Sequence, residues 1–189
     1  MKIQSFTFNL FQENTFVLWD KTGDCIIIDP GCYEKKEDQK LVDFIKENDL
    51  NPVKLINTHC HIDHILGNKF VSEKWNLELH MHKTDLPLLE GAGDIAKMYG
   101  FENYKGSPYP KHYLEEGDIL EFGESKLEIL FTPGHAPGHI CLFNKEESFI
   151  VSGDVLFNGS VGRTDLPGGD FDTLIESIKT KLMTLQDET

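Results

Sequence analysis

The sequence contains no apolar run close to the roughly 20 residues that an α-helix needs to cross a bilayer. Its mean hydropathy of -0.33 is ordinary for a soluble globular protein. The first residues carry a single Lys and then alternate between apolar and polar side chains, so they lack the continuous apolar core of a secretory signal. We therefore expect no membrane span and a cytoplasmic location.

Cysteine and basic residues are also scarce. The four cysteines form no CxxC pair and no dense framework, which favours a reducing compartment over a disulfide scaffold and indicates small core residues. Lys and Arg number 18 against 32 for Asp and Glu, which gives a formal net charge of -14. Because non-specific nucleic-acid affinity comes from basic side chains that release counterions, nucleic acid is a poor candidate partner.

The predicted organisation is a single domain, residues 1–189, because no repeat, low-complexity tract or linker divides the chain. Periodicity predicts nine strands and four helices, with Thr84 or Asp85 capping the third helix and Asp170 or Asp172 capping the last. The strands are 1–8, 16–20, 25–29, 53–57, 77–81, 119–122, 126–131, 140–143 and 148–151, and the helices are 37–48, 67–75, 84–89 and 171–185. We expect α/β layering, with an irregular excursion over residues 91–113.

Four residues with metal-ligand side chains directly follow one predicted strand: His59, His61, Asp63 and His64. Imidazole nitrogen and carboxylate oxygen suit zinc, iron or manganese. Their spacing lets one loop offer two ligands to each of two neighbouring ions. The alternative is a turn with hydrogen-bonded histidines, but grouped buried imidazoles without a metal gain unfavourable charge or lose hydrogen bonds. We therefore predict a binuclear metal site, with Cys60 packing away from it.

Two further predicted strands end in residues of the same kind. One is followed by Thr-Pro-Gly-His-Ala-Pro-Gly-His at 132–139, and the other by Ser-Gly-Asp at 152–154. The Gly and Pro residues permit tight turns and disfavour a helix that would present His135 and His139 together. Spacing alone leaves open which of these histidines binds a metal. Asp154 is a further candidate ligand, with a helix cap or a turn aspartate as the alternative.

These motifs, taken in order, resemble the metallo-β-lactamase superfamily and, within it, the short glyoxalase II-like hydrolases. The resemblance rests on HxHxDH, TPGHxPGH and SGD, followed by Gly-Arg-Thr-Asp at 162–165, and it covers almost the whole chain, including the Ile-Asp-Pro-Gly turn at 28–31. It implies a four-layer αβ/βα sandwich of two mixed sheets, with helices outside and the metals at the edge where strand-end loops meet.

The resemblance also implies two sets of metal ligands joined by one carboxylate. The sets are His59, His61 and His135 for the first ion, Asp63 and His64 for the second, and Asp154 as the bridge. It implies that His139 packs or hydrogen-bonds behind the site and that Asp29 supports the metal loops. The true β-lactamases of this superfamily carry a cysteine at the position comparable to Asp154, so the resemblance disfavours antibiotic hydrolysis.

The chain departs from the family pattern at its end. The family usually supplies a last histidine for the second metal from a Pro-Gly-His turn after the final long helix, whereas this sequence ends in Gln-Asp-Glu-Thr at 186–189. We therefore expect a C-terminal truncation, with solvent or a partner completing the second site or with a weakly held second metal.

The implied activity is hydrolysis of a small-molecule thioester, with S-2-hydroxyacylglutathione as the first substrate to test. Two divalent ions, zinc above all with iron or manganese as alternatives, would hold a hydroxide, because metal binding lowers the pKa of water from 15.7 toward about 7. Asp63 would guide the hydroxide proton, and a thiol with a pKa near 8.5 leaves without a strong general acid. Arg163 is a candidate contact for a substrate carboxylate, with an ion pair to Asp165 or Asp170 as the alternative.

Two other functions stay open. Persulfide dioxygenases are similar, share the Gly-Arg-Thr-Asp stretch, and use one iron held by two histidines and an aspartate, which here would be His59, His135 and Asp154. They tend to lack the histidine found here at position 139, which favours the hydrolase. A metal-binding but inactive member is the third possibility, because the sequence lacks the last ligand histidine.

Overall fold

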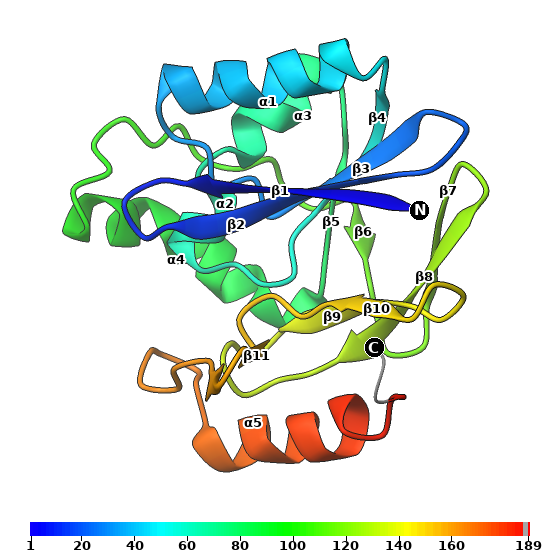
Figure 1. Ribbon diagram of the computed structural model, residues 1–189. Coiled ribbons are helices and arrows are strands. Elements are labelled where there is room, and N and C mark those ends of the chain that lie inside the picture. The colour runs from blue at the N-terminus through cyan, green and yellow to red at the C-terminus, as the bar shows by residue number, and fades with distance from the viewer. Residues whose placement is uncertain (187–188) are drawn as a thin grey trace.

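Three hydrophobic cores separate four layers of secondary structure in the computed structural model, which describes residues 1–186 and 189. The layers are helices, a six-stranded sheet, a four-stranded sheet and a further helix, and Figure 1 shows them stacked from top to bottom. This arrangement confirms the αβ/βα sandwich. The predicted C-terminal truncation stays a prediction.

The first sheet is mixed, with the order β1-β2-β3-β4-β5-β6. Strands β1 to β3 form the predicted antiparallel meander, whereas β3 to β6 pair in parallel. Parallel pairing brings the carboxyl ends of β3 and β4 to one edge of the sheet, where their loops meet. The strands are Lys2–Phe8 (β1), Glu13–Trp19 (β2), Asp24–Ile28 (β3), Asn51–Ile56 (β4), Leu79–Met81 (β5) and His112–Tyr113 (β6).

The second sheet is antiparallel in all its pairings, with the order β10-β9-β8-β7. It therefore differs from the expected pair of mixed sheets. Its successive strands are joined by short turns and by the loop 132–139, which are too short for the crossover of about a dozen residues that parallel pairing requires. The strands are Ile119–Phe122 (β7), Ser125–Phe131 (β8), Ile140–Asn144 (β9) and Phe149–Val151 (β10), followed by the hairpin Leu156–Phe157 (β11) and Ser160–Val161 (β12).

Alternation along the strands builds the cores on both faces of each sheet. In β3, Cys25 and Ile27 pack in the core beneath the outer helices, whereas Ile26 and Ile28 pack between the two sheets. Side chains of a strand alternate between faces, so a sheet covered on both sides reads as a continuous apolar run. Each side chain of this size that is fully buried contributes roughly 1.5–3 kcal/mol relative to an exposed one.

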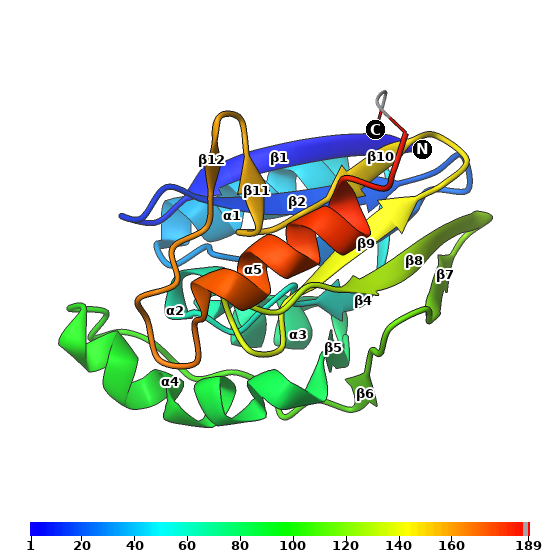
Figure 2. The ribbon, with the colours of Figure 1, turned by 90° about the horizontal axis from the view of Figure 1, so that it is seen from below.

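The helices cover the two outer faces. Leu41 and Ile45 of α1 (Lys35–Glu47) and Val71 of α3 (Asn68–Trp75) pack on the first sheet, whereas Leu174 of α5 (Phe171–Ser177) packs on the second. Figure 2 shows α5 lying across β8, β9 and β10, and a π-helical turn, Ile178–Leu182 (η2), continues it. Among the described residues, no helix is both long enough and apolar enough to cross a membrane.

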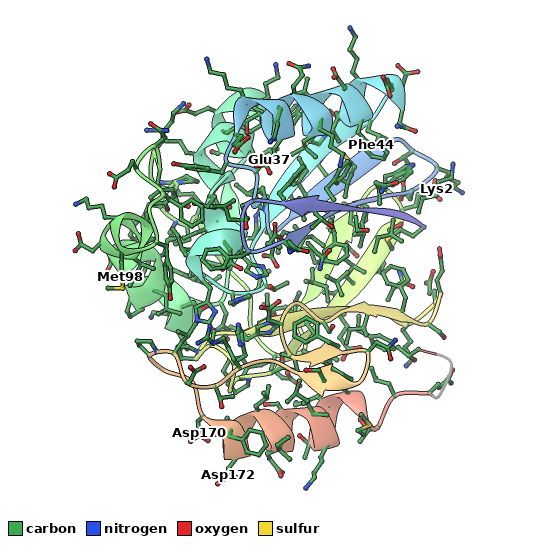
Figure 3. The ribbon with its side chains drawn as sticks, turned by 60° about the vertical axis from the view of Figure 1, so that its left-hand side comes forward. Lys2, Glu37, Phe44, Met98, Asp170 and Asp172 are labelled. Atoms are coloured by element: carbon green, nitrogen blue, oxygen red, sulfur yellow. The ribbon has the colours of Figure 1, made fainter. Side chains whose placement is uncertain are left out.

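For two helices the sequence predicted two alternative N-cap residues each, Thr84 or Asp85 and Asp170 or Asp172. Asp170 caps α5, because its carboxylate accepts the backbone N–H of Thr173 at 2.8 Å, and Figure 3 shows it at the start of that helix beside Asp172. At the other start, neither predicted residue acts as a side-chain cap. The ring of His82 accepts the N–H of Thr84 and opens the 3-10 turn Lys83–Asp85 (η1), and Asp85 makes no cap hydrogen bond to the helix that follows.

That following helix, α4 (Leu86–Met98), is longer than predicted, so the expectation of an irregular excursion is wrong for residues 91–98, and the short strand β6 makes it wrong for residues 112–113 as well. Figure 3 places Met98 at its far end. Leu89, Ala92 and Ala96 form a buried stripe at helical spacing that packs on the first core. Gly91 and Gly93, which weaken a helix by about 1 kcal/mol each relative to Ala, face open space. Burial of the stripe offsets their unfavourable propensity.

Candidate metal centre

The His59 to His64 cluster lies at the carboxyl end of β4, as the sequence predicted. The loop 57–61 after β4 carries His59, and the short helix α2 (Ile62–Ile65) begins directly after His61. This helix presents Asp63 and His64 in consecutive positions. A loop followed by one helical turn therefore brings His59 and His61 to one place, and Asp63 and His64 to a neighbouring place.

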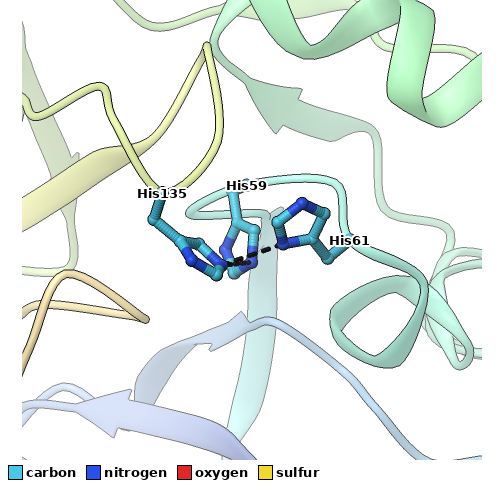
Figure 4. A group of neighbouring side chains, drawn as sticks. All are labelled: His59, His61 and His135. Carbon is cyan, nitrogen blue, oxygen red and sulfur yellow. Dashed lines mark hydrogen bonds between the residues drawn. The ribbon is translucent and has the colours of Figure 1, made fainter. Parts of the chain in front are cut away.

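Three histidine side chains from two loops converge at one point, as Figure 4 shows. The Nε2 atom of His135 lies 2.9 Å from Nδ1 of His61 and 3.2 Å from Nε2 of His59. His59 and His135 are almost entirely buried, with exposed fractions of 1% and 2%. His61 and His135 are 74 residues apart in the chain, so the packing of one sheet on the other creates this cluster.

Hydrogen bonds behind two of these rings set their tautomers. Nδ1 of His135 donates to the carbonyl oxygen of Arg163 at 2.7 Å. Nδ1 of His59 lies 3.1 Å from the Thr58 hydroxyl, which itself donates to Asp29 and therefore accepts from the ring. Both Nε2 atoms then carry lone pairs that face each other. Facing lone pairs repel unless a cation lies between them, which is the arrangement of metal-ligating histidines.

A second group of ligand types lies beside the first. The Nε2 atom of His64 is 3.6 Å from a carboxylate oxygen of Asp63 and 3.6 Å from Oδ1 of Asp154. The other oxygen of Asp154, Oδ2, is 3.6 Å from Nε2 of His135. One carboxylate therefore reaches both the three-histidine cluster and His64. This is the geometry of a side chain that can bridge two neighbouring cations.

The electrostatics of the two groups differ. Burial lowers the pKa of His61 to about 3, with His135 adding to the effect, and burial also lowers the pKa of His59 and of His135 itself. These imidazoles are held neutral, which is the form that binds a metal. Burial also acts to lower the pKa of His64, but the carboxylates around it, Asp63 first, raise that pKa above its ordinary value. Either a proton on His64 or a bound metal cation compensates the negative charge of these carboxylates.

Asp29 supports the cluster from behind. One of its oxygens accepts the backbone N–H of Thr58 at 2.7 Å, and the other lies 3.2 Å from Nδ1 of His64. Asp29 adopts a φ of 49° directly after β3, in the left-handed region that non-glycine residues seldom occupy. Its side chain thus joins the end of β3 to the histidine loop, which agrees with the supporting role expected for it.

Glu13 is a residue of this region that the sequence did not reveal. It opens β2, three residues earlier than the predicted strand, and its side chain is buried against the site. Thr15 donates to Oε2 at 3.0 Å, whereas Oε1 has no hydrogen-bond partner among the described residues and lies 3.8 Å from Nδ1 of His64. A lone Glu in a strand carries no signal that distinguishes it from a surface residue.

His139 lies behind the ligand cluster. Its ring stacks on that of His59 with centroids 4.9 Å apart, and its Nε2 accepts the backbone N–H of Asp154 at 3.2 Å. The turn before Asp154 needs glycine, because Gly153 has a φ of 48° and a Cβ there would lie 2.6 Å from Nε2 of His139. His139, in the motif at 132–139, thereby connects Asp154 of the Ser-Gly-Asp motif to His59 of the first motif.

Two other predicted residues lie outside the cluster. Cys60 is buried with its sulfur 3.7 Å from that of Met81, which confirms that it packs away from the histidines. The Arg163 guanidinium forms two 2.7 Å contacts with the carboxylate of Asp165, and both side chains are exposed. The ion pair was the alternative to a substrate contact for Arg163, and the two roles are compatible because the pair is exposed.

Comparison with known proteins identifies the family. Residues 8–189 match the family model described as the metallo-beta-lactamase superfamily. The chain is 37% identical over its full length to a hydroxyacylglutathione hydrolase, GloC, of Haemophilus influenzae, and it covers 87% of that protein. It is 40% identical to a probable metallo-hydrolase, YqgX, of Bacillus subtilis, with 87% of this chain and 76% of that protein aligned. A persulfide dioxygenase, ETHE1, of Bos taurus is 31% identical over 90% of this chain and 59% of its own length.

Solved structures agree with this assignment. The fold superposes with a TM-score of 0.88 on BLEG-1, described as a B3 metallo-beta-lactamase, at 28% identity over 98% of this chain and 87% of the other. It superposes with a TM-score of 0.85 on TTHA1623 in a di-iron-bound form, at 37% identity over 97% of this chain and 87% of the other. Together with the match over residues 8–189, these likenesses show that the chain belongs to the metallo-β-lactamase superfamily.

Proposed function

We propose that this protein is a glyoxalase II-like metallo-hydrolase that cleaves a small thioester such as S-2-hydroxyacylglutathione. The observation that carries the proposal is the position of Asp154, whose two carboxylate oxygens each lie 3.6 Å from a different histidine, His135 and His64. The hydroxyacylglutathione hydrolase GloC, at 37% identity over the whole chain, supports the substrate class.

The proposed ligands follow from the two groups of side chains. Donor atoms of three neutral imidazoles meet in the first group, and two carboxylates surround one imidazole nitrogen in the second. We assign them as His59, His61 and His135 to one ion, Asp63 and His64 to the other, and Asp154 to both. Nitrogen and carboxylate donors suit zinc, with iron or manganese as alternatives. The di-iron form of TTHA1623 supports iron as one of these alternatives.

Bound divalent ions would lower the pKa of a water molecule and polarise the substrate carbonyl. The protein's own residues supply position and proton handling. Asp63 is 21% exposed against 4% for His64, so its carboxylate can reach both solvent and substrate. We assign to Asp63 the acceptance of a proton from the attacking water. The hydrogen bonds behind His59 and His135 hold both rings in the tautomer that directs a lone pair to the site.

Substrate binding is proposed for Arg163. Its backbone carbonyl orients His135, and its guanidinium is exposed beside the site, paired with Asp165. A substrate carboxylate can share the guanidinium with Asp165, because an exposed ion pair is worth only about 0–1 kcal/mol. The four cysteines are free and buried, which suits the reducing cytoplasm that we propose as the location. We further propose that residues 1–189 act as one domain, with no nucleic-acid partner.

A second candidate activity is persulfide dioxygenation with one iron. The two histidines and the aspartate that this chemistry would use are close together, since Nε2 of His135 lies 3.2 Å from His59 and 3.6 Å from Asp154. The ETHE1 relative supports this alternative over 59% of its own length. The hydrolase is preferred because Asp63 and His64 form a further ligand group directly beside the first.

Elemental analysis of the purified protein, combined with an S-lactoylglutathione hydrolysis assay, tests the proposal. Two divalent ions per chain and thioester turnover are expected. In Asp63→Ala, turnover should decrease about 100-fold or more, because both a ligand and the proton acceptor are lost. Asp43→Ala, which removes an exposed carboxylate from α1, is the matched control and should behave as the wild type.

Four results would contradict the proposal in whole or in part. One iron per chain with oxygen uptake on glutathione persulfide would identify the dioxygenase instead. Turnover of a β-lactam without turnover of the thioester would assign the activity suggested by the BLEG-1 likeness. Metal binding without any of these activities would identify an inactive member, and unchanged thioester turnover in Asp63→Ala would exclude the role of Asp63.

A further inference from the structure

The three-histidine group of His59, His61 and His135 depends on two loops that follow strands of different sheets. The loop after β4 carries His59 and His61, and the loop between β8 and β9 carries His135. One backbone hydrogen bond joins these loops, from the N–H of Ile140 to the carbonyl oxygen of Thr58 at 2.9 Å. A single backbone hydrogen bond of this kind leaves the rest of both loops to be held by other contacts.

The carboxylate of Asp85 contacts both loops two residues away from this hydrogen bond. The N–H of Cys60, between the two histidines of the first loop, donates to Oδ2 at 2.7 Å. The N–H of Gly138, in the second loop, donates to Oδ1 at 2.5 Å. Each oxygen therefore accepts one backbone donor from one loop. Asp85 itself comes from a third part of the chain, the η1 turn after β5, and it is fully buried.

The surroundings of Asp85 are shaped for this contact. A Cβ at position 138 would lie 2.6 Å from the backbone nitrogen of Asp85 and 2.7 Å from its Oδ1, so only glycine admits the carboxylate this closely. Asp85 makes no cap hydrogen bond to its own helix, because its side chain turns away toward the loops. Burial raises the pKa of Asp85 to about 6, with the two N–H donors acting in the opposite direction. A carboxylate buried in this way is unfavourable unless it is hydrogen-bonded.

We propose that Asp85 is a positioning residue that sets the separation of the two histidine loops and thereby determines the affinity of the three-histidine group for a divalent metal. The inference rests on the metal site of the proposed function but not on its thioester chemistry. It assigns a role to a residue that contacts neither the metal ligands' side chains nor the substrate. Backbone groups of residues 60 and 138 transmit its effect.

The variant Asp85→Asn tests the inference with little change in volume. An amide has one acceptor oxygen and one donor nitrogen, so one of the two backbone N–H groups would face another donor. The dissociation constant for Zn²⁺, measured by competition with a chromophoric chelator, should increase roughly 10- to 100-fold, as is typical when the partners of ligand residues are removed. Turnover at saturating Zn²⁺ should change much less than turnover at limiting Zn²⁺.

Asp20→Asn is the matched control. Asp20 also accepts backbone N–H groups from two turns, at Thr22 and Glu124, but it belongs to the β2–β3 turn and not to the loops that carry the histidines. This variant should lower thermal stability and leave the dissociation constant for Zn²⁺ unchanged. If Asp85→Asn behaves in the same way, Asp85 is merely structural and the inference is overturned.

A measurement on the wild-type protein covers the case in which Asp85→Asn does not fold. The amide protons of Cys60 and Gly138 should exchange slowly and at similar rates in the metal-free protein, because one carboxylate holds both. Exchange of either amide at the rate of an exposed loop would overturn the inference. Tight Zn²⁺ binding without thioester hydrolysis would contradict the proposed function alone and leave the role of Asp85 intact.

Discussion

The Nε2 atoms of His59 and His135 lie 3.2 Å apart, and the second nitrogen of each ring already donates to an oxygen behind it. Neither ring can therefore donate to the other while both are neutral. Burial opposes protonation of both rings. The pair is an unfavourable contact in the absence of a cation and a favourable one in its presence, so metal binding should stabilise the folded protein.

We predict that His135→Ala removes most of this stabilisation. Wild type should show a higher melting temperature with Zn²⁺ than after chelation, since a ligand that binds only the folded state stabilises it by mass action. In His135→Ala the difference should be much smaller, because only the second group keeps its side chains, and turnover should decrease about 100-fold or more. Differential scanning fluorimetry with Zn²⁺ or a chelator measures it. His112→Ala removes an exposed histidine from the edge of the first sheet and is the control; an equal metal response in both variants would refute the ligand role.

We predict that substitutions of Asp63 and Asp154 change the number of bound metal ions differently. Asp63→Asn should retain one ion per chain, because Asp63 is close to His64 and belongs to the second group only. Asp154→Asn should weaken both ions, because its oxygens reach His135 and His64 alike. Metal content after gel filtration separates the two cases. One ion lost from each variant, with equal affinity for the other, would contradict a bridging Asp154.

We predict that His139→Leu destabilises the protein by about 1–3 kcal/mol, the penalty for leaving a buried hydrogen-bonding group unpaired. The backbone N–H of Asp154 loses its acceptor, and the hydroxyl of Thr132 loses the ring nitrogen 3.2 Å away. Urea denaturation of the metal-free protein measures the free energy of unfolding. A value equal to that of the wild type would show that solvent replaces the imidazole without loss.

We predict a pH-dependent contribution from Asp20, at the turn between β2 and β3. Burial acts to raise its pKa, but hydrogen bonds from Thr22, Glu124 and Ser125 outweigh it and lower the pKa to about 2. Because the folded pKa is below the unfolded value near 3.9, the contribution is fully present above that value and is lost as the pH falls toward 2. It should amount to only about 1 kcal/mol at an exposed position.

Thermal denaturation of wild type and Asp20→Asn between pH 3 and pH 7 measures this contribution. The variant should be less stable at pH 7, and the difference should narrow as the pH decreases through about 4. A constant difference across that range would show that the Asp20 charge has no part in the stability of the turn.

Local sequence was sufficient for the longer strands and for the four ligand residues of the first motif, but it did not reveal the two-residue strands β6, β11 and β12. The apolar runs at β3 and β4 are long enough to specify buried strands, and only Asn57 and Thr58 separate β4 from the His59 to His64 motif, so chain connectivity alone places these side chains together. Helix α4 was underestimated, because its two glycines oppose a helix locally while burial of Leu89, Ala92 and Ala96 favours it. That burial requires a neighbouring sheet and has no local signal.

The sequence by itself determined that imidazoles and carboxylates gather at strand ends, since motif spacing is a property of the chain. Only the tertiary structure decided that His135 meets His61 across 74 residues, that Glu13 is buried beside His64, and that Asp85 joins two loops instead of capping its helix. Each of these depends on how two sheets pack and on which backbone N–H groups face a carboxylate. The hydrogen bonds that hold these loops act between segments distant in the chain, so they form only after folding.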